Sequence, residues 1–332
     1  MSNSNTQTAL VTGATGFIGQ HLVLQLLQKG FSVRALSREK KSDNVDSTAS
    51  IEWVVADVTV KKSLKTVCQH IDYVFHLAGY AHAWSDDDAD FQSKHHEVNY
   101  QGTMNLAEVA LAAGVKRFIY MSTIKACADS EKMIDEDFQE SASTPYGRAK
   151  YDAEQQLLTF YAHSAMQPII LRPALVYGPG WKGNLSVMLK AVEKRLFPSP
   201  PLTKNIKSMV SVYDLSTAAI QAVLMPLPKH RIFIVTDGME YNLRIIYQIM
   251  CEALGRRVPK YYLPFFIWKC LSKVGDVQQV LTKKRVPFCT EGLDKLFGAS
   301  HYQSKYITDE LGFTPRYSLA DVMPDILSIM HS

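Results

Sequence analysis

Short apolar segments alternate with amphipathic ones through the first half of the chain. The apolar segments are rich in Val, Ile, Phe and Tyr, and they predict strands at residues 8–12, 32–36, 51–56, 72–76, 117–122 and 168–171. The amphipathic segments predict helices, most clearly at 98–113, which Gly114 closes, and at 146–162. Near-continuous apolar strands separated by helices indicate an α/β fold with a doubly wound parallel sheet covered on both faces.

This regular alternation loosens after about residue 178. A Pro-rich stretch at 197–201 precedes expected strands at 209–212 and 232–236 and a helix at 242–254 that ends at Gly255. We therefore expect a first domain of residues 1–178 and a smaller lobe of residues 179–332, partly interleaved because later segments can return to the sheet. We expect the aromatic rings of residues 261–268 to pack inside the smaller lobe.

The first expected strand leads into a glycine-rich turn and a helix. The glycines are spaced Gly13-x-x-Gly16-x-x-Gly19, and apolar residues at helical spacing accompany them: Ile18, Leu22 and Leu26. A strand, a glycine turn and a helix in this order aim free backbone N–H groups and the positive end of a helix dipole at one point. The stretch therefore predicts a Rossmann-type site for the pyrophosphate of a dinucleotide.

A tyrosine and a lysine open the helix expected at 146–162. Tyr146 and Lys150 are four residues apart, which places the phenol and the ammonium on one helix face. A nearby ammonium is expected to lower the pKa of the phenol towards the range of a general acid/base. Upstream, Ser122 and Thr123 end an apolar strand, where either hydroxyl can reach the crevice at the carboxyl edge of the sheet.

Composition narrows the classes of function. Of the 332 residues, 47% are hydrophobic and 20% are charged, and the net charge of +4 is mild, so no nucleic-acid partner is expected. The first seven residues are polar, and the longest apolar run, near 263–268, is far below the roughly 20 residues of a membrane span. We expect a cytoplasmic protein with no membrane partner.

No metal site is expected either. The five cysteines are scattered and show no CxxC spacing. The loop of residues 80–96 contains His and Asp side chains, but no pair has a convincing ligand spacing: His82, Asp86, Asp87, Asp88, His95 and His96. A polar loop over the mouth of the substrate site is the favoured interpretation.

Taken in order, these motifs resemble the extended short-chain dehydrogenase/reductase family, which contains nucleotide-sugar epimerases, dehydratases and reductases. The similarity covers roughly residues 8 to 250 through TGATGFIG at 12–19, Asp57, HLAG at 76–79, Asn99 in VNYQGT, Thr123 in MSTIKA, Tyr146 and Lys150 in YGRAK, and Arg172-Pro173 in LRPALVYGPG. Within the family, STIKA and PALVYGPGWKGN look most like bacterial enzymes that form UDP-N-acetylquinovosamine.

The resemblance implies a role for each matching residue. Tyr146 is the expected general acid/base, Lys150 holds the nicotinamide ribose, and Thr123 orients the reacting C–O bond. The implied cofactor residues are Gly13, Gly16, Phe17, Ile18, Gly19, Arg38, Asp57, Val58, Leu77, Ala78, Gly79, Tyr146, Lys150 and Pro173. The implied substrate residues are Thr123, Tyr146, Asn184 and Lys207, of which the last two face the nucleotide diphosphate. The family also implies a homodimer.

The end of the second expected strand bears on the choice of cofactor. Folds that prefer NAD place an acidic residue about 20 residues after the glycines. Here Ser37-Arg38 stands at that place, so the acid is missing and a guanidinium suited to a 2′-phosphate is available. We therefore predict NADP, with NAD as the alternative if Arg38 stacks on adenine instead.

The leading functional hypothesis is a 4-keto reductase that acts on a UDP-sugar. A nucleotide-sugar 4-epimerase is the main alternative, although epimerases of galactose metabolism usually carry Tyr-Gly where Cys127-Ala128 stands. An enzyme similar to 3β-hydroxysteroid dehydrogenases ranks lower, and so does a non-catalytic NADP-binding sensor, because Thr123, Tyr146 and Lys150 are all present. Lys125 can reach the substrate but is more simply a surface residue.

Overall fold

A computed structural model describes residues 6–39, 51–81, 89–128, 133–138, 140–161, 163–282 and 289–331. Its strands are β1 (Thr8–Thr12), β2 (Ser32–Ser37), β3 (Ile51–Val55), β4 (Tyr73–His76), β5 (Arg117–Met121), β6 (Gln167–Pro173), β7 (Leu175–Tyr177), β8 (Met209–Ser211) and β9 (Ile232–Val235). Its α-helices are α1 (Phe17–Gln28), α2 (Ala89–His95), α3 (Gly102–Ala112), α4 (Pro145–Tyr161), α5 (Asn184–Glu193), α6 (Val212–Leu224), α7 (Leu243–Ala253), α8 (Phe265–Thr282), α9 (Thr290–Phe297), α10 (Ile307–Leu311) and α11 (Leu319–His331).

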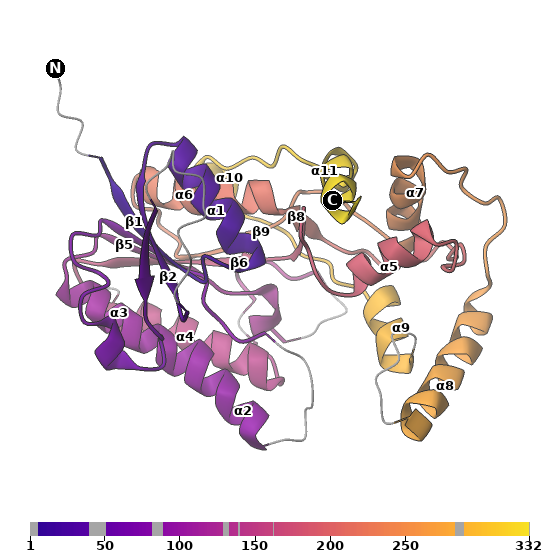
Figure 1. The fold of residues 1–332 in the computed structure, drawn as a ribbon, viewed down its shortest axis with the longest axis horizontal. Helices are drawn as coiled ribbons and strands as arrows, with labels where there is room; N and C mark the ends of the chain where they lie inside the picture. The colour runs from indigo at the N-terminus through magenta and orange to yellow at the C-terminus, as the bar shows by residue number, and fades with distance from the viewer. Residues whose placement is uncertain are drawn as a thin grey trace.

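A parallel seven-stranded sheet in the order β3-β2-β1-β4-β5-β6-β9 organises the described part of the chain (Figure 1). Successive side chains of a strand point to opposite faces of the sheet. In β1, Val11 therefore packs with α1 and α6, whereas Leu10 packs with α3 and α4. The predicted doubly wound α/β fold is confirmed, with each expected strand found within two residues of its place.

The chain after residue 178 contributes to both parts of the structure. After that residue, α6 covers one face of the sheet and β9 becomes its edge strand. The smaller lobe has its own core, in which α5, α7, α9 and α11 surround Tyr177, Met209 and the buried Trp268 of α8 (Figure 1). The two parts thus share the polypeptide between residues 178 and 332.

The aromatic residues before and within α8 do not all pack as expected. Trp268 is fully buried, but Tyr261 is 89% exposed, and Tyr262, Phe265 and Phe266 are exposed as well. The expectation that these rings pack inside the lobe is therefore confirmed for Trp268 and in part for Phe265, whose ring centroid lies 5.1 Å from that of the buried Phe297. It is wrong for the tyrosines and Phe266. The spacing of apolar residues along a helix does not by itself show which face of that helix is buried.

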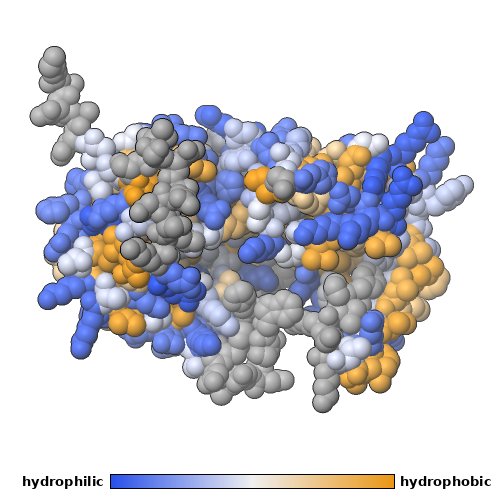
Figure 2. Space-filling view, viewed as in Figure 1, coloured by the Kyte–Doolittle hydropathy of each residue, from blue (hydrophilic) through white to orange (hydrophobic). Residues whose placement is uncertain are grey.

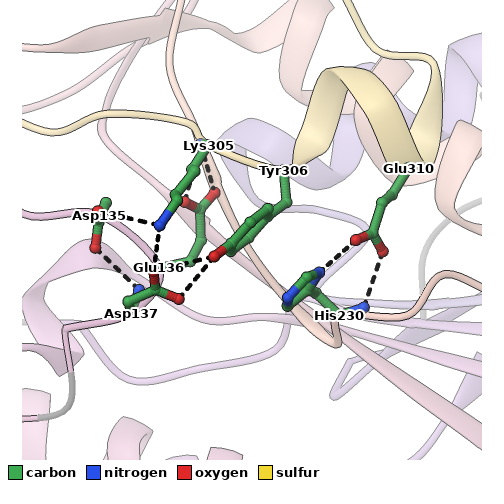
Figure 3. A network of polar contacts seen from close by, with 7 residues as sticks. All are labelled: Asp135, Glu136, Asp137, His230, Lys305, Tyr306 and Glu310. Carbon is green, nitrogen blue, oxygen red and sulfur yellow. Dashed lines mark hydrogen bonds and ion pairs between the residues drawn. The ribbon is translucent and has the colours of Figure 1, made fainter.

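A polar network fastens the C-terminal segment to the loop that precedes α4 (Figure 3). The carboxylate of Glu136 accepts the backbone N–H of Ile234 in β9 at 3.0 Å and that of Lys305 at 2.9 Å. The rings of His230 and Tyr306 stack with their centroids 3.8 Å apart. The network holds residues 135–137 against the edge strand β9 and the C-terminal segment.

Candidate active site

The glycine-rich turn joins β1 to α1 as the sequence predicts. Gly13 has a φ of +66°, and a Cβ atom there would lie 2.7 Å from the backbone nitrogen of Ala78. A Cβ on Gly19 would lie 2.1 Å from the carbonyl oxygen of Gly13, so only glycine permits this approach of helix to strand. Gly16 precedes α1, which has no side-chain cap and no acidic residue in its first turn. Its free N–H groups suit an anion.

A cavity of about 550 Å³ opens in front of this turn. Eight of the predicted cofactor residues line it: Gly13, Gly16, Arg38, Asp57, Val58, Leu77, Ala78 and Gly79. Phe17 and Ile18 instead pack against the hydrophobic cores, Gly19 packs on the turn, and Pro173 is buried at the end of β6. The cavity adjoins the uncapped N–H groups at the start of α1, which can bind a pyrophosphate, so the residues present fit a dinucleotide cofactor.

At the end of β2 the wall of the cavity carries a cation, Arg38, where many NAD sites contain an acid. Ser37 ends β2 and is buried, and the exposed Arg38 follows it on the cavity wall, whereas Glu39 is not among the lining residues. The carboxylate of Asp57 is occupied locally, since it accepts the N–H and the hydroxyl of Thr59 at 2.9 and 2.8 Å.

At the end of β5 the structure separates the two candidate hydroxyls. Ser122 is buried and donates its hydroxyl to the carboxylate of Glu154. Thr123 follows in extended conformation, and its oxygen accepts the N–H of Lys125 at 3.2 Å as the cap of a short 3₁₀ turn. The Thr123 side chain lies close enough to the phenol of Tyr146 to act, against the larger effect of burial, to lower its pKa. Thr123 is therefore the hydroxyl next to the proposed acid/base.

Gly147 allows the first turn of α4 to reach this position. A Cβ on Gly147 would lie 2.1 Å from the carbonyl oxygen of Lys125, so any other residue would push α4 away from the turn at 124–126. This role of Gly147 was not predicted. In the sequence, the only indication of this role was a glycine within the first turn of an expected helix. Glycine lowers helix stability, so its presence there suggests a steric requirement.

Lys150 lies beneath the cavity, on the face of α4 that also carries Tyr146. Its ammonium is buried, donates to the carbonyl of Met121 at 3.0 Å, and lies 4.6 Å from the ring centroid of Tyr120. A Cβ on Gly79 would lie 3.5 Å from Lys150 Nζ, which places the ammonium next to the cavity wall. Burial lowers the pKa of Lys150 to about 8, against the opposing effect of Glu154.

The prediction that the pKa of Tyr146 is lowered is wrong for the protein without a bound cofactor. Burial raises the pKa of the phenol to about 12, and the Thr123 side chain offsets only part of that rise. The reason is that desolvation penalises the phenolate, while the ammonium of Lys150 is directed at the carbonyl of Met121.

Two further groups support the site without having been predicted for it. Asn99 lies in a π-helical turn at His96–Gln101 and bonds both backbone groups of Tyr80, at 2.8 and 2.9 Å. Its side-chain oxygen would be 3.0 Å from a Cβ on Gly79, so it fixes the cavity wall near Lys150. Glu154 and Arg172 form a buried ion pair under the end of β5.

Among the described residues, the two predicted substrate residues of the smaller lobe form no hydrogen bond with Thr123, Tyr146 or Lys150. Asn184 is exposed and begins α5 after Gly183. The buried ammonium of Lys207 donates to the carbonyls of Lys295 and Gly298, at 3.0 and 2.8 Å, at the C-terminal end of α9. Burial lowers the pKa of Lys207 to about 8, with a smaller contribution from Lys125. Both roles stay predictions.

Part of the loop considered for a metal falls outside the described residues, including His82 and Asp86 to Asp88. Of the loop's histidines the structure describes two. His95 is buried, with its ring centroid 5.6 Å from that of Tyr146. His96 lies against Tyr100, at 4.8 Å between centroids.

A dinucleotide cavity beside a Thr–Tyr–Lys cluster, on a Rossmann-type sheet, defines an NAD(P)-dependent oxidoreductase. The comparisons agree: the chain belongs to the NAD dependent epimerase/dehydratase family, whose model matches residues 9–204. It is 28% identical to UDP-glucose 4-epimerase of Vibrio cholerae over 95% of this chain and 93% of that one. It is 23% identical to N-acetyl-alpha-D-glucosaminyl-diphospho-ditrans,octacis-undecaprenol 4-epimerase of Escherichia coli O157:H7, over 94% and 91%.

The fold is also similar to that of a solved structure, MoeE5 in complex with UDP-glucuronic acid and NAD. The TM-score is 0.75 at 22% identity, over 98% of this chain and 99% of that chain. This likeness establishes the shared fold.

Proposed function

We propose that the chain transfers a hydride at C4 of a nucleotide-linked sugar, as an NADPH-dependent reductase of a UDP-4-keto sugar. The observation that carries the proposal is the position of Tyr146 and Lys150 on α4 beside Thr123: against the larger effect of burial, the Thr123 side chain acts to lower the pKa of Tyr146, and the ammonium of Lys150 lies next to Gly79 in the cavity wall. A carbonyl oxygen that meets both hydroxyls is held and protonated at one point. The relatives named above as sugar 4-epimerases support a sugar substrate with chemistry at C4.

The proposed roles of the chain's own residues follow from their positions. Thr123 holds the sugar oxygen by a hydrogen bond, and Tyr146 gives that oxygen its proton. The ammonium of Lys150 then stabilises the resulting phenolate through its positive charge. When bound, the nicotinamide supplies the hydride. Asn184 and Lys207 are proposed to contact the nucleotide diphosphate, and the enzyme is proposed to act as a homodimer.

The preference for NADPH rests on Arg38. A guanidinium bonded to a phosphate makes charge-assisted hydrogen bonds worth about 1.5–3 kcal/mol, or roughly 10- to 100-fold in affinity. Arg38→Gln should therefore weaken NADPH binding by that factor and leave NADH binding within about threefold. The matched control Lys62→Gln removes an exposed cation elsewhere on the same domain. Equal losses for both cofactors would refute the preference, and NAD, present in several structures of similar fold, would take its place.

The second candidate is a 4-epimerase, which the 28% identity to UDP-glucose 4-epimerase over nearly the whole chain favours. Two assays separate the candidates. The reductase consumes NADPH stoichiometrically with a UDP-4-keto-6-deoxy sugar, seen as loss of absorbance, and forms the UDP-6-deoxy sugar with a hydroxyl at C4. The epimerase interconverts UDP-glucose and UDP-galactose with no net change in cofactor absorbance. Absence of NADPH consumption with any UDP-4-keto sugar would exclude the reductase.

A further inference from the structure

Helix α8 turns its apolar side chains towards solvent and its small and polar ones towards the protein. The inward face carries Trp268, Ser272 and Gly275, which are buried, and Asp276, which bonds to Thr290 at the start of α9. The outward face is aliphatic and aromatic: Phe266, Val274, Val277, Val280 and Leu281 are between 59% and 78% exposed. Figure 2 shows this hydrophobic surface gathered over α8. A surface helix of a globular protein normally has the opposite arrangement.

Basic and aromatic side chains accompany this outward face. Lys269 and Lys273 are exposed on the helix, along one side of the apolar stripe. The two exposed tyrosines, Tyr261 and Tyr262, lie in the connection that leads to it. Residues 255–282 contain five basic residues and one acidic residue, so the 36 basic and 32 acidic residues of the chain leave 31 of each elsewhere. The entire formal charge of +4 therefore resides in this segment.

We infer that the outward face of α8 docks on the surface of an anionic phospholipid membrane. An apolar stripe bordered by lysines, with aromatic residues at one end, is the pattern of a helix that lies in the headgroup region. The positive charge of the segment complements anionic headgroups. None of the described helices has the length and apolar character needed to cross a bilayer, which agrees with α8 lying on the surface. This inference does not depend on the proposed reaction.

A second copy of the chain is a poorer occupant of this face. The 18 residues of α8 form a helix about 27 Å long, and a stripe about 10 Å wide covers roughly 270 Å². A stable interface buries about 800 Å² on each partner and is depleted in lysine. The outward face of α8 is too small and too basic to fit that description.

Flotation of the full chain with vesicles tests the inference. The vesicles contain phosphatidylcholine and phosphatidylglycerol at about two to one, and the salt concentration is roughly 0.05 or 0.5 M. We expect the wild type to float with these vesicles at low salt, much less at high salt, and not with pure phosphatidylcholine. Val277→Glu should lower the partition coefficient roughly tenfold, because it places a charge in the centre of the apolar stripe. Its control, Leu24→Glu, alters an equally exposed apolar residue of α1 and should bind as the wild type.

The lysines provide an independent test with a matched control. Lys269→Gln combined with Lys273→Gln should lower binding roughly 30-fold at low salt. Lys62→Gln combined with Lys65→Gln removes the same charge from the first domain and should have little effect. A wild type that stays in the soluble fraction at low salt, or a Val277→Glu variant that floats like the wild type, overturns the inference. Light scattering that shows a wild-type dimer split by Val277→Glu would instead assign the face to a second copy.

Discussion

The ion pair between Glu154 and Arg172 should be the most sensitive point in the packing beneath the site. Both side chains are almost fully buried, with 0% and 2% exposure. Arg172 Nε donates to both carboxylate oxygens, at 3.0 and 3.1 Å, and a terminal nitrogen donates as well. Glu154→Gln leaves the guanidinium buried without a counter-charge, which costs about 3–5 kcal/mol.

This cost converts into a measurable shift in melting temperature. At about 2.1 cal/mol/K per residue, unfolding 332 residues has an entropy of about 0.7 kcal/mol/K, so each kcal/mol lowers Tm by about 1.4 °C. Glu154→Gln should therefore lower Tm by roughly 4–7 °C in calorimetry. The control Lys116→Ala breaks the exposed pair with Asp72 and should shift Tm by less than about 1.5 °C.

A double variant distinguishes the net contribution of the ion pair to stability from the cost of leaving one of its charges buried and unpaired. Glu154→Leu combined with Arg172→Met removes both charges, and apolar replacement of a buried pair is usually neutral or stabilising. We expect its Tm to lie well above that of Glu154→Gln. A Glu154→Gln variant that melts within about 1 °C of the wild type would refute the reasoning.

Three further predictions concern the site itself. Tyr146→Phe should lower turnover by about 10²- to 10⁴-fold and leave cofactor affinity, measured by titration, nearly unchanged; turnover at the wild-type rate would exclude Tyr146 as the acid/base. Because burial lowers the pKa of Lys150 to about 8, kcat/KM should fall as pH rises through 8. Over about pH 8 to 10.4 the free energy of unfolding should rise with pH, because the lysine is still protonated in the unfolded state when it is neutral in the folded state. Activity should therefore fall with pH while stability, measured by urea unfolding, rises. Gly19→Ala places a Cβ 2.1 Å from the Gly13 carbonyl and should abolish cofactor binding in the same titration. Gly30→Ala meets no atom within 4 Å but lies at a φ of +84°, so it should lower stability and leave cofactor binding unchanged.

Most of the strands and helices could be predicted from the sequence because the two kinds of element have different hydrophobic periods. The sheet was predictable for that reason, and the glycine turn was predictable because its spacing has a direct steric meaning. The π-helical turn that places Asn99 was not predictable, since its irregular spacing is hidden inside a longer amphipathic helix. Thus the helix expected at 98–113 is found only from Gly102 as an α-helix.

The site was predictable as a set of residue types, but its electrostatics were not. Lys150 and Glu154 are four residues apart and look in sequence like an exposed helical ion pair. Packing buries both and pairs Glu154 with Arg172, which lies 18 positions later in β6. Burial also reverses the expected shift in the pKa of Tyr146. These pKa shifts and ion pairs depend on which residues meet as hydrogen-bond partners in the folded protein. The spacing of residues along the sequence does not reveal those partners.

The uncapped start of α1 has a thermodynamic consequence. Its first N–H groups receive no side-chain acceptor and no carboxylate from the first turn, so with Gly16 as the cap the free protein forgoes about 0.3 kcal/mol of the stabilisation that a Ser or Asp cap contributes. A dinucleotide that occupies this position binds only the folded chain. Such linkage stabilises the native state by about 2.7 kcal/mol when the ligand is at 100 times its Kd. The conformational stability of this protein is therefore a function of dinucleotide concentration, and the size of that dependence measures how well each dinucleotide matches the turn.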